Sequence, residues 1–405
     1  MTRPTRVRAG ALALAAAASC AAALGAPAAA GAAEAPAVRA PAAIVMDAAS
    51  GRVLTAKRAD SPRAMASTTK LMTALLTLER ARPTDVFRAP RYDAGPLESK
   101  IGLRAGERMA VRDLLVALLL ESANDAAVTL AEGIAGSRDA FVVAMNERAA
   151  ELGLTETSYA NPVGFDDPAN HSSPRDLARL ARLLLRDRRF AEIVDRPRAA
   201  LRSGSRRRVV ANRNDLVRTH PFVDGVKTGH TGEAGFVLVG SASRPGARVI
   251  SVVMGEPSET MRDVDSLALL RWGLDRFVRV RPLARGRVLG RAGVSGFDDR
   301  TVGLRAARSV SLTVRRGASV RTRVDAPDEL EGPLPAGRRV GTAVVLVDGR
   351  AAARVPLLTA ARVPEAGLGR RLGPGLGWAL AFAVLAAAAV AAARLRRIGS
   401  RRGVG

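Results

Sequence analysis

The sequence predicts an α+β fold for residues 41–280, with helices in the middle of this region and strands at both of its ends. Two observations support this prediction. Apolar residues recur at helical spacing in the central segments, as they do between Leu114 and Leu119. Short β-rich runs separated by turns open and close the region. We therefore expect one sheet built from both ends of the region, with a helical part inserted between them.

The first expected element is a β-hairpin, followed by a helix. Two β-rich runs at 43–47 and 52–56 flank the turn Ala48-Ala49-Ser50-Gly51. The next helix starts at Ser67 and runs to about Arg82. The helices expected after it are 111–121, 126–134, 138–152, one opened by Ser173-Pro174, and 261–277. The late strands are expected at 223–232, 235–240 and 248–254.

Residues 1–33 have the layout of a secretory signal peptide. Three arginines precede an uncharged run from Ala9 to about Leu24, and a small-residue cleavage site follows near Ala32. The only cysteine, Cys20, lies inside this leader. Its removal would leave no disulfide, no thiolate metal site and no cysteine nucleophile. The three histidines are too scattered to suggest a metal site, so neither a metal nor another cofactor is expected.

Two further segments follow the α+β region. Residues 281–363 contain short apolar and polar runs separated by Gly and Pro turns, which predicts a small all-β domain. Residues 373–393 carry no charge and are long enough for a transmembrane helix. The basic tail at 394–405 would then lie in the cytoplasm. With an exported leader, the domains between would be anchored outside the membrane.

The chain is strongly basic, with a formal net charge of +25 and a pI of about 11.6. Aromatic residues make up only 3%, and no recognition motif accompanies the charge, so nucleic acid is not expected as a partner. Anionic lipid headgroups and acidic wall polymers fit an exported protein. A generally arginine-rich solvated surface explains the charge equally well. Lysine is rare, which makes Lys70 and Lys227 informative, because a desolvated lysine gives up its proton whereas arginine does not.

Three polar clusters carry candidate chemistry. Ser67 and Lys70 are three residues apart on one helix, so the amine is placed to reach the hydroxyl and activate it. Ser122 and Asn124 lie in a polar tetrapeptide between two apolar helices, which indicates either a structural hydrogen-bond network or a site. The third cluster, Lys227-Thr228-Gly229, falls on a strand.

Together, and in this order, the clusters resemble the signature of penicillin-recognising serine enzymes. Their surroundings resemble the low-molecular-weight penicillin-binding proteins that are D-alanyl-D-alanine carboxypeptidases, above all at 64–73, 118–127, 161–165 and 223–231. The resemblance implies a penicillin-binding/β-lactamase-like transpeptidase domain at 41–280, with an antiparallel sheet and a helical subdomain. It also implies peptidoglycan stem peptides ending in D-Ala-D-Ala as substrates and β-lactam antibiotics as inhibitors.

The resemblance further implies roles for individual residues. Ser67 would attack the carbonyl of the penultimate D-alanine, and Lys70 would be the general base, its pKa lowered by burial and by Lys227. Ser122 and Asn124 would relay a proton and hold the peptide. The remaining candidates bind the terminal carboxylate or shape the oxyanion hole and its surroundings: Lys227, Thr228, Gly229, His230 and Arg262.

Three alternatives remain open. A class A β-lactamase shares the motifs but needs a glutamate before the lysine motif, where this chain offers only Asp166 and Asp167. A peptidoglycan endopeptidase differs in pocket shape, which the sequence does not reveal. A non-catalytic wall-associated protein of the same fold would have no use for an intact Ser67, Lys70 and Lys227.

Overall fold

The computed structural model describes residues 34–96, 98–365 and 373–399. The expected signal peptide at 1–33 and the last part of the expected basic tail, 400–405, lie outside the described residues. The description below therefore starts at the first strand of the α+β region.

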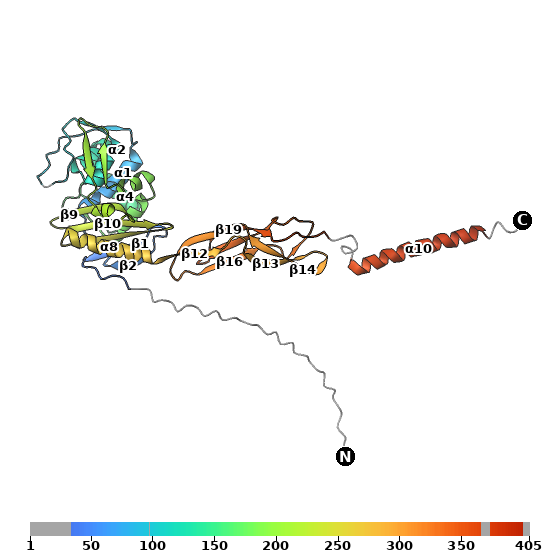
Figure 1. The fold of residues 1–405 in the computed structure, drawn as a ribbon. Coiled ribbons are helices and arrows are strands. Elements are labelled where there is room, and N and C mark those ends of the chain that lie inside the picture. Colours follow the sequence, from blue (N-terminus) through green and yellow to red (C-terminus); the bar gives the residue numbers. More distant parts are fainter. Residues whose placement is uncertain (1–33, 97, 366–372, 400–405) are drawn as a thin grey trace, which may run out of the picture. The chain divides into compact units, whose positions relative to one another are not determined.

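A five-stranded antiparallel sheet joins the two ends of this region (Figure 1). Its strand order is β2-β1-β11-β10-β9. The strands are β1 (Ala42–Asp47), β2 (Val53–Lys57), β9 (Val223–Thr231), β10 (Gly235–Arg244) and β11 (Ala247–Glu256). The predicted hairpin is confirmed as β1 and β2, and β1 pairs in turn with β11, placing Ile44 opposite Val252.

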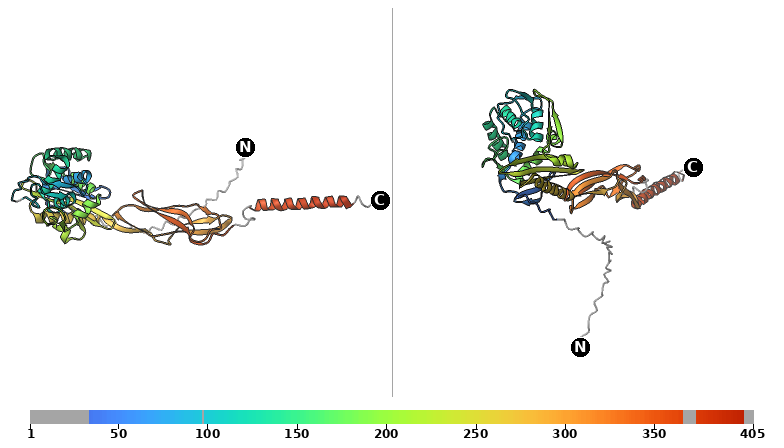
Figure 2. Two further views of the ribbon diagram at one scale, coloured as in Figure 1. Left: turned by 90° about the horizontal axis from the view of Figure 1, so that it is seen from above. Right: turned by 60° about the vertical axis from the view of Figure 1, so that its left-hand side comes forward.

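Both faces of the sheet are covered, because apolar residues occupy successive positions along its central strands. Ile44 and Val239 face the core shared with the helical part, whereas Val45 and Leu238 face a second core under α8 (Glu259–Asp275). Figures 1 and 2 show α8 on one face of the sheet and helices such as α1, α2 and α4 on the opposite face. The buried residues of α7, Leu216 and Val217, belong to the core on the α8 side.

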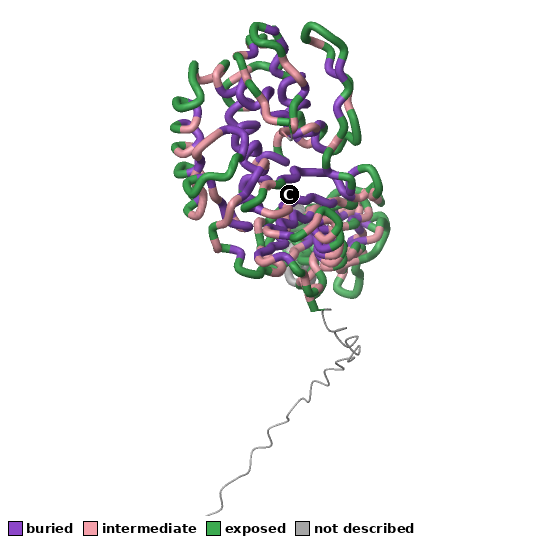
Figure 3. Tube along the Cα trace, turned by 90° about the vertical axis from the view of Figure 1, so that its left-hand side faces the viewer, coloured by how far each residue is buried: buried purple, intermediate pink, exposed green. Residues whose placement is uncertain are grey.

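The helical part contains most of the predicted helices, with ends shifted by a few residues. Its elements are η1 (Ala66–Thr69), α1 (Lys70–Arg80), α2 (Val111–Val116), η2 (Ala117–Glu121), α3 (Asn124–Ala135), α4 (Arg138–Glu151), α5 (Pro174–Leu184), α6 (Arg188–Val194) and α7 (Asp215–Thr219). The predicted start of α5 is confirmed, since the Oγ of Ser173 caps it by accepting the N–H of Asp176 at 3.2 Å. Buried residues gather inside this part and along the sheet (Figure 3).

Some elements differ from the prediction. The short helices α6 and α7 were not expected. The basic stretch 202–208 runs into an unpredicted hairpin of β7 (Arg198–Leu201) and β8 (Arg208–Ala211). Four further short strands form two pairs: β3 (Arg63–Ala64) pairs with β6 (His171–Ser172), and β4 (Val86–Arg88) pairs with β5 (Arg108–Ala110). Short, partly exposed segments of this kind carry little periodic signal, because tertiary contacts decide their conformation.

The region after α8 is all-β within the described residues up to 365. Its strands are β12 (Phe277–Leu283), β13 (Val288–Val294), β14 (Phe297–Ala306), β15 (Val310–Arg315), β16 (Val320–Asp325), β17 (Glu329–Leu330), β18 (Arg339–Val347) and β19 (Arg350–Thr359). β12 pairs with β15, and a six-stranded sheet has the order β16-β18-β19-β14-β13-β17. Residues such as Leu304, Val345 and Leu357 form a core of its own.

The segment expected to cross the membrane, 373–393, forms part of α10 (Gly373–Gly399). Within the described part of the chain, no helix combines the length and hydropathy needed to cross a bilayer. This differs from the expected transmembrane helix. Much of the segment is alanine, which contributes little to membrane insertion compared with leucine or phenylalanine.

Candidate active site

Ser67 lies in η1, the short helical turn that leads into α1. Ala66 before it has a φ of 48°, in the left-handed region. Two glycines allow other segments to approach this turn closely. A Cβ atom on Gly164 would overlap the carbonyl of Ala66, and one on Gly229 would lie 3.0 Å from the backbone nitrogen of Ser67. The turn therefore lies between the loop 161–168 and β9.

The amine of Lys70 lies beside the hydroxyl of Ser67. The distance from Nζ to Oγ is 2.8 Å, and Nζ also donates to the carbonyl oxygen of Val163 at 2.5 Å. Burial lowers the pKa of Lys70 well below its usual value, and the positive charge of Lys227 lowers it further. The carboxylates of Glu98 and Asp125 act in the opposite direction. The turn thus holds a hydroxyl next to a desolvated amine that is able to accept its proton.

Ser122 and Lys227 form a second serine–lysine pair. Ser122 follows η2 with a φ of 62°, at the junction with the next helix. Lys227 is buried in β9, and its Nζ donates to Ser122 Oγ and to the carbonyl oxygen of Thr228, both at 2.8 Å. Burial lowers the pKa of Lys227 to about 7, helped by the positive charges of Arg213 and Arg262.

Asn124 is the first residue of α3 and is buried. Its backbone N–H donates to the carbonyl of Ser99 at 2.8 Å, and its Nδ2 donates to Glu98 Oε2 at 2.9 Å. The next residue, Asp125, accepts the backbone N–H groups of Ile101 at 3.1 Å and Leu103 at 2.9 Å. The polar tetrapeptide is therefore hydrogen-bonded both to the loop before α2 and to Lys227.

The remaining predicted site residues lie on β9 and α8. Thr228 is buried beside Lys227, whereas His230 is exposed and its ring stacks on that of Phe236, with centroids 4.0 Å apart. The guanidinium of Arg262 is buried and forms ion pairs with Glu259 at 2.9 Å and Asp263 at 2.8 Å. Hydrogen bonds thus join Ser67 to Lys70 and Ser122 to Lys227, while Arg262 acts on Lys227 through its charge.

Comparison with known proteins identifies the family. The family profile described as D-alanyl-D-alanine carboxypeptidase matches residues 29–258, more than half of the chain. The chain belongs to the D-alanyl-D-alanine carboxypeptidase family. It is a serine-type carboxypeptidase of the penicillin-binding class, associated with peptidoglycan of the cell wall. A second profile, the C-terminal domain of penicillin-binding protein 5, matches residues 277–365, which contain β12 to β19.

Individual relatives agree with this assignment. The chain is 33% identical over 346 residues to the D-alanyl-D-alanine carboxypeptidase DacA of Haemophilus influenzae, covering 82% of this chain and 87% of the relative. It is 31% identical over 337 residues to DacF of Bacillus subtilis, covering 81% and 87%. The crystal structure of penicillin-binding protein 5 from Haemophilus influenzae superposes with a TM-score of 0.58 at 33% identity, covering 82% of this chain and all of that one.

The acids of the loop 161–168 have a structural role in this carboxypeptidase. The carboxylate of Asp166 accepts the hydroxyl of Thr231 at 2.5 Å and the N–H of Glu233 at 3.3 Å. Both contacts join the loop to the turn between β9 and β10. The loop carbonyl of Val163 then reaches Lys70. Asp166 therefore holds the loop against the turn between β9 and β10.

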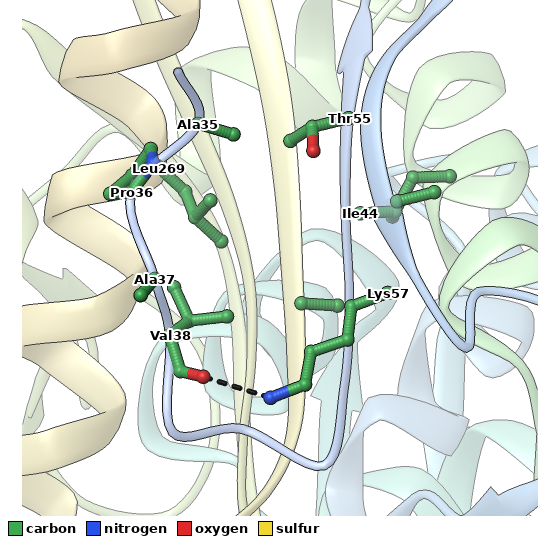
Figure 4. A pocket seen from close by; sticks show the side chains of 10 residues that line it. Ala35, Pro36, Ala37, Val38, Ile44, Thr55, Lys57 and Leu269 are labelled. Atoms are coloured by element: carbon green, nitrogen blue, oxygen red, sulfur yellow. Dashed lines mark hydrogen bonds between the residues drawn. The ribbon is translucent and has the colours of Figure 1, made fainter.

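A cavity of about 310 Å³ lies away from these motifs in the carboxypeptidase (Figure 4). It is lined by the segment 35–38, by residues of β1 and β2, and by Leu269 of α8. Its lining is mostly apolar, and the amine of Lys57 points across it to donate to the carbonyl of Val38 at 2.8 Å. None of the residues of the three motifs lines this cavity.

The sequence motifs do not include Glu98, although the structure places it at the carboxypeptidase site. Its carboxylate accepts the side chain of Asn124 and lies close enough to affect the pKa of Lys70. Glu98 lies in a Pro- and Gly-containing segment, 26 residues before Asn124, and has no fixed spacing to any motif. Only the folded loop brings it to the site.

Proposed function

We propose that Ser67 is the nucleophile and Lys70 the general base with which this carboxypeptidase removes the terminal D-alanine from peptidoglycan stem peptides. The observation that carries the proposal is the 2.8 Å distance between Lys70 Nζ and Ser67 Oγ, combined with the full burial of the amine. A buried amine with a lowered pKa is neutral for part of the time at physiological pH, and a neutral amine accepts the hydroxyl proton.

The reaction proceeds in two halves. In the first, Lys70 takes the proton of Ser67, whose Oγ bonds to the carbonyl carbon of the penultimate D-alanine. The C–N bond then breaks, and the leaving amine receives a proton by way of Ser122 while Asn124 holds the peptide. Free D-alanine departs and an ester remains on Ser67. In the second half, a water molecule attacks this ester and gives a proton to the amine of Lys70. The ester bond breaks, Ser67 Oγ regains a proton, and the shortened peptide leaves.

The remaining residues bind the terminal carboxylate of the substrate or stabilise the oxyanion. The charges of Lys227 and Arg262 and the hydroxyl of Thr228 bind the terminal carboxylate. The backbone N–H groups of Ser67 and His230 stabilise the oxyanion. Gly229 supports this arrangement, because its missing side chain lets β9 approach Ser67. Penicillins enter the same pathway, since Ser67 opens the β-lactam amide in place of the D-Ala-D-Ala bond.

The direct test uses the purified full-length protein and a peptide ending in D-Ala-D-Ala. Release of free D-alanine is measured together with covalent labelling by a fluorescent penicillin. The wild type releases D-alanine and is labelled, and Ser67→Ala does neither. A Ser67→Ala protein that still becomes labelled contradicts the proposal. So does a wild type that splits a cross-linked muropeptide dimer into monomers but releases no D-alanine from the peptide.

We also propose that the carboxypeptidase is exported by residues 1–33 and held at the membrane by its C-terminal segment, with 281–363 as a spacer domain. The leader pattern supports export, and an uncharged stretch followed at once by arginines such as Arg394 and Arg396 supports attachment. The test compares the full chain with one ended after Val363. The full chain sediments with membranes and resists extraction by high salt, whereas the shortened chain is released. Equal release of both chains contradicts attachment by this segment.

A further inference from the structure

The carboxylate of Glu98 is the meeting point of three donors at the rim of the candidate active site. Its Oε1 accepts the backbone N–H of Gly95 at 2.7 Å, and its Oε2 accepts Asn124 Nδ2 at 2.9 Å. The hydroxyl of Tyr92 donates to the same Oε2. Glu98 therefore connects its own loop directly to a side chain of the catalytic motif.

These contacts fix which way the amide of Asn124 faces. An ionised carboxylate accepts hydrogen bonds and donates none. Only the Nδ2 end of the amide can therefore lie against Glu98, and the Oδ1 end must lie on the other side. A neutral partner such as glutamine both donates and accepts, and so would admit either orientation. The contact is also held from the backbone, because Ser99 next to Glu98 accepts the N–H of Asn124 at 2.8 Å.

Glu98 also supplies a negative charge that acts on Lys70. Burial alone would raise the pKa of Glu98, but the hydrogen bonds from Tyr92, Asn124 and Gly95 outweigh it and keep the pKa below its usual value. The group is therefore ionised at neutral pH. Its charge opposes burial and Lys227 in setting the pKa of Lys70. The other charges near this loop are of both signs. Lys100 donates to the carbonyl of Gly95, Arg138 lies over the ring of Tyr92, and Arg91 and Asp93 form an exposed ion pair. Asp125, next to Asn124, acts on Lys70 in the same direction as Glu98.

We propose that Glu98 is a positioning residue of the carboxypeptidase reaction, which orients the amide of Asn124 for the peptide and places a permanent negative charge near the amine of Lys70. The inference rests on the proposed roles of Lys70 and Asn124. It assigns to Glu98, in the connection between β4 and β5, a part in catalysis.

The test is the Glu98→Gln variant of the full-length protein, assayed with a D-Ala-D-Ala peptide across a pH series. Loss of a hydrogen bond to a charged group lowers kcat/KM by about tenfold or more. Loss of the negative charge lowers the pKa of Lys70. The acid limb of the pH profile, where Lys70 must lose its proton, therefore moves to lower pH. Glu98→Asp, which keeps the charge, leaves the limb where it is in the wild type.

Matched variants separate this role from a purely structural one. Tyr92→Phe loosens the same loop but keeps the carboxylate, so it lowers activity only slightly and leaves the acid limb in place. Glu192→Gln removes one charge from the exposed pair with Arg188, far from the motifs in sequence. It changes neither kcat/KM nor the acid limb of the pH profile. Thermal unfolding verifies that every variant is folded.

Two outcomes overturn the inference: an unchanged kcat/KM and pH limb in Glu98→Gln, or equal effects of Glu98→Gln and Tyr92→Phe on both. Ser67→Ala is measured in the same series. If Ser67→Ala is inactive while Glu98→Gln matches the wild type, only the role of Glu98 fails. If Ser67→Ala remains active, the proposed catalytic mechanism fails as well.

Discussion

The amine of Lys227 donates a 2.8 Å hydrogen bond to the hydroxyl of Ser122, a residue 105 positions earlier in the chain. Both groups are buried. This pair joins the sheet to the helical part, because Lys227 belongs to β9 and Ser122 lies between η2 and α3. The pair lies close enough to Lys70 for the charge of Lys227 to lower the pKa of that amine. The two serine–lysine pairs are therefore coupled electrostatically.

Replacing Lys70 by arginine exchanges the proposed base for a side chain that keeps its proton. Arginine does not deprotonate in proteins, so Ser67 loses its proton acceptor. We expect kcat/KM for a D-Ala-D-Ala peptide to fall by about 10²- to 10⁴-fold, as is typical for loss of general base catalysis. Stopped-flow acylation by a penicillin measures the same step. Lys57→Arg, at the cavity of Figure 4, is the control and retains full activity. An active Lys70→Arg enzyme contradicts the proposed base.

Gly229→Ala tests the close approach of β9 to the catalytic turn. A Cβ atom here would lie 3.0 Å from both the Cβ of Ala66 and the nitrogen of Ser67, so one of the two segments must shift. We expect kcat to fall by at least about tenfold, because a small displacement of an oxyanion donor weakens its hydrogen bond to the transition state. Gly232→Ala, with no atom within 4 Å of its added Cβ, is the matched control and leaves kcat unchanged. Equal activity of the two variants would contradict the role given to this contact.

Arg262→Gln tests the proposed binding of the substrate carboxylate. We expect KM for a free D-Ala-D-Ala carboxylate to rise by about tenfold, since an interaction between charged groups is lost. A peptide amidated at its C-terminus lacks that charge. This amidated peptide is a poor substrate for both proteins, and we expect the same KM for the variant and the wild type. An equal loss on both peptides would show that Arg262 acts only through its ion pairs with Glu259 and Asp263.

The buried amine of Lys227 gives stability a defined pH dependence. Its pKa is about 7 in the folded protein and 10.5 in the reference state. Between these values the unfolded chain binds a proton at this site that the folded protein does not. The free energy of unfolding therefore rises with pH across this window. Denaturant titrations at several pH values measure the slope, and Lys227→Met has a smaller slope than the wild type. Parallel slopes for the two proteins would contradict the lowered pKa.

The ion pair of Arg208 and Glu107 is predicted to stabilise the helical part. Both side chains are buried, with Nη1 2.8 Å from Oε1, and the pKa of Glu107 is lowered to about 2 although burial alone would raise it. Arg208→Gln leaves this carboxylate without its partner, so we expect a loss of about 3–5 kcal/mol in the free energy of unfolding. Arg188→Gln, in an exposed pair with Glu192, changes it by less than about 0.5 kcal/mol. The contribution of the Glu107 carboxylate to the free energy of unfolding is fully present above pH 4.5 and is lost as the pH falls towards 2.

Parts of the site were predictable because they depend on local geometry. Ser67 and Lys70 lie three residues apart on consecutive helical turns, and the structure confirms that their side chains meet. The lowered pKa of Lys70, and the contribution of Lys227 to it, is confirmed as well. Ser122 and Lys227 could be connected only through resemblance to a family, since no periodicity links residues on different elements.

Other features depend on contacts that have no sequence pattern. Glu98 reaches Asn124 through a loop whose course is set by the bonds from Ile101 and Leu103 to Asp125. The hairpin of β7 and β8 around the basic stretch 202–208 was not predicted, because each of its strands has only four residues. In both cases tertiary contacts outweigh local propensity.

The pairing of β1 with β11 has a consequence for how the enzyme becomes active. Ile44 and Val252, which face each other in this pairing, are separated in sequence by most of the domain. In the sheet, β9 lies at the edge, beyond β11 and β10. A nascent chain that has only reached α5 already contains Ser67, Lys70 and Asn124, but has no strand on which Lys227 could meet Ser122. The proposed site is therefore complete only after β9 has been synthesised and has paired with β10.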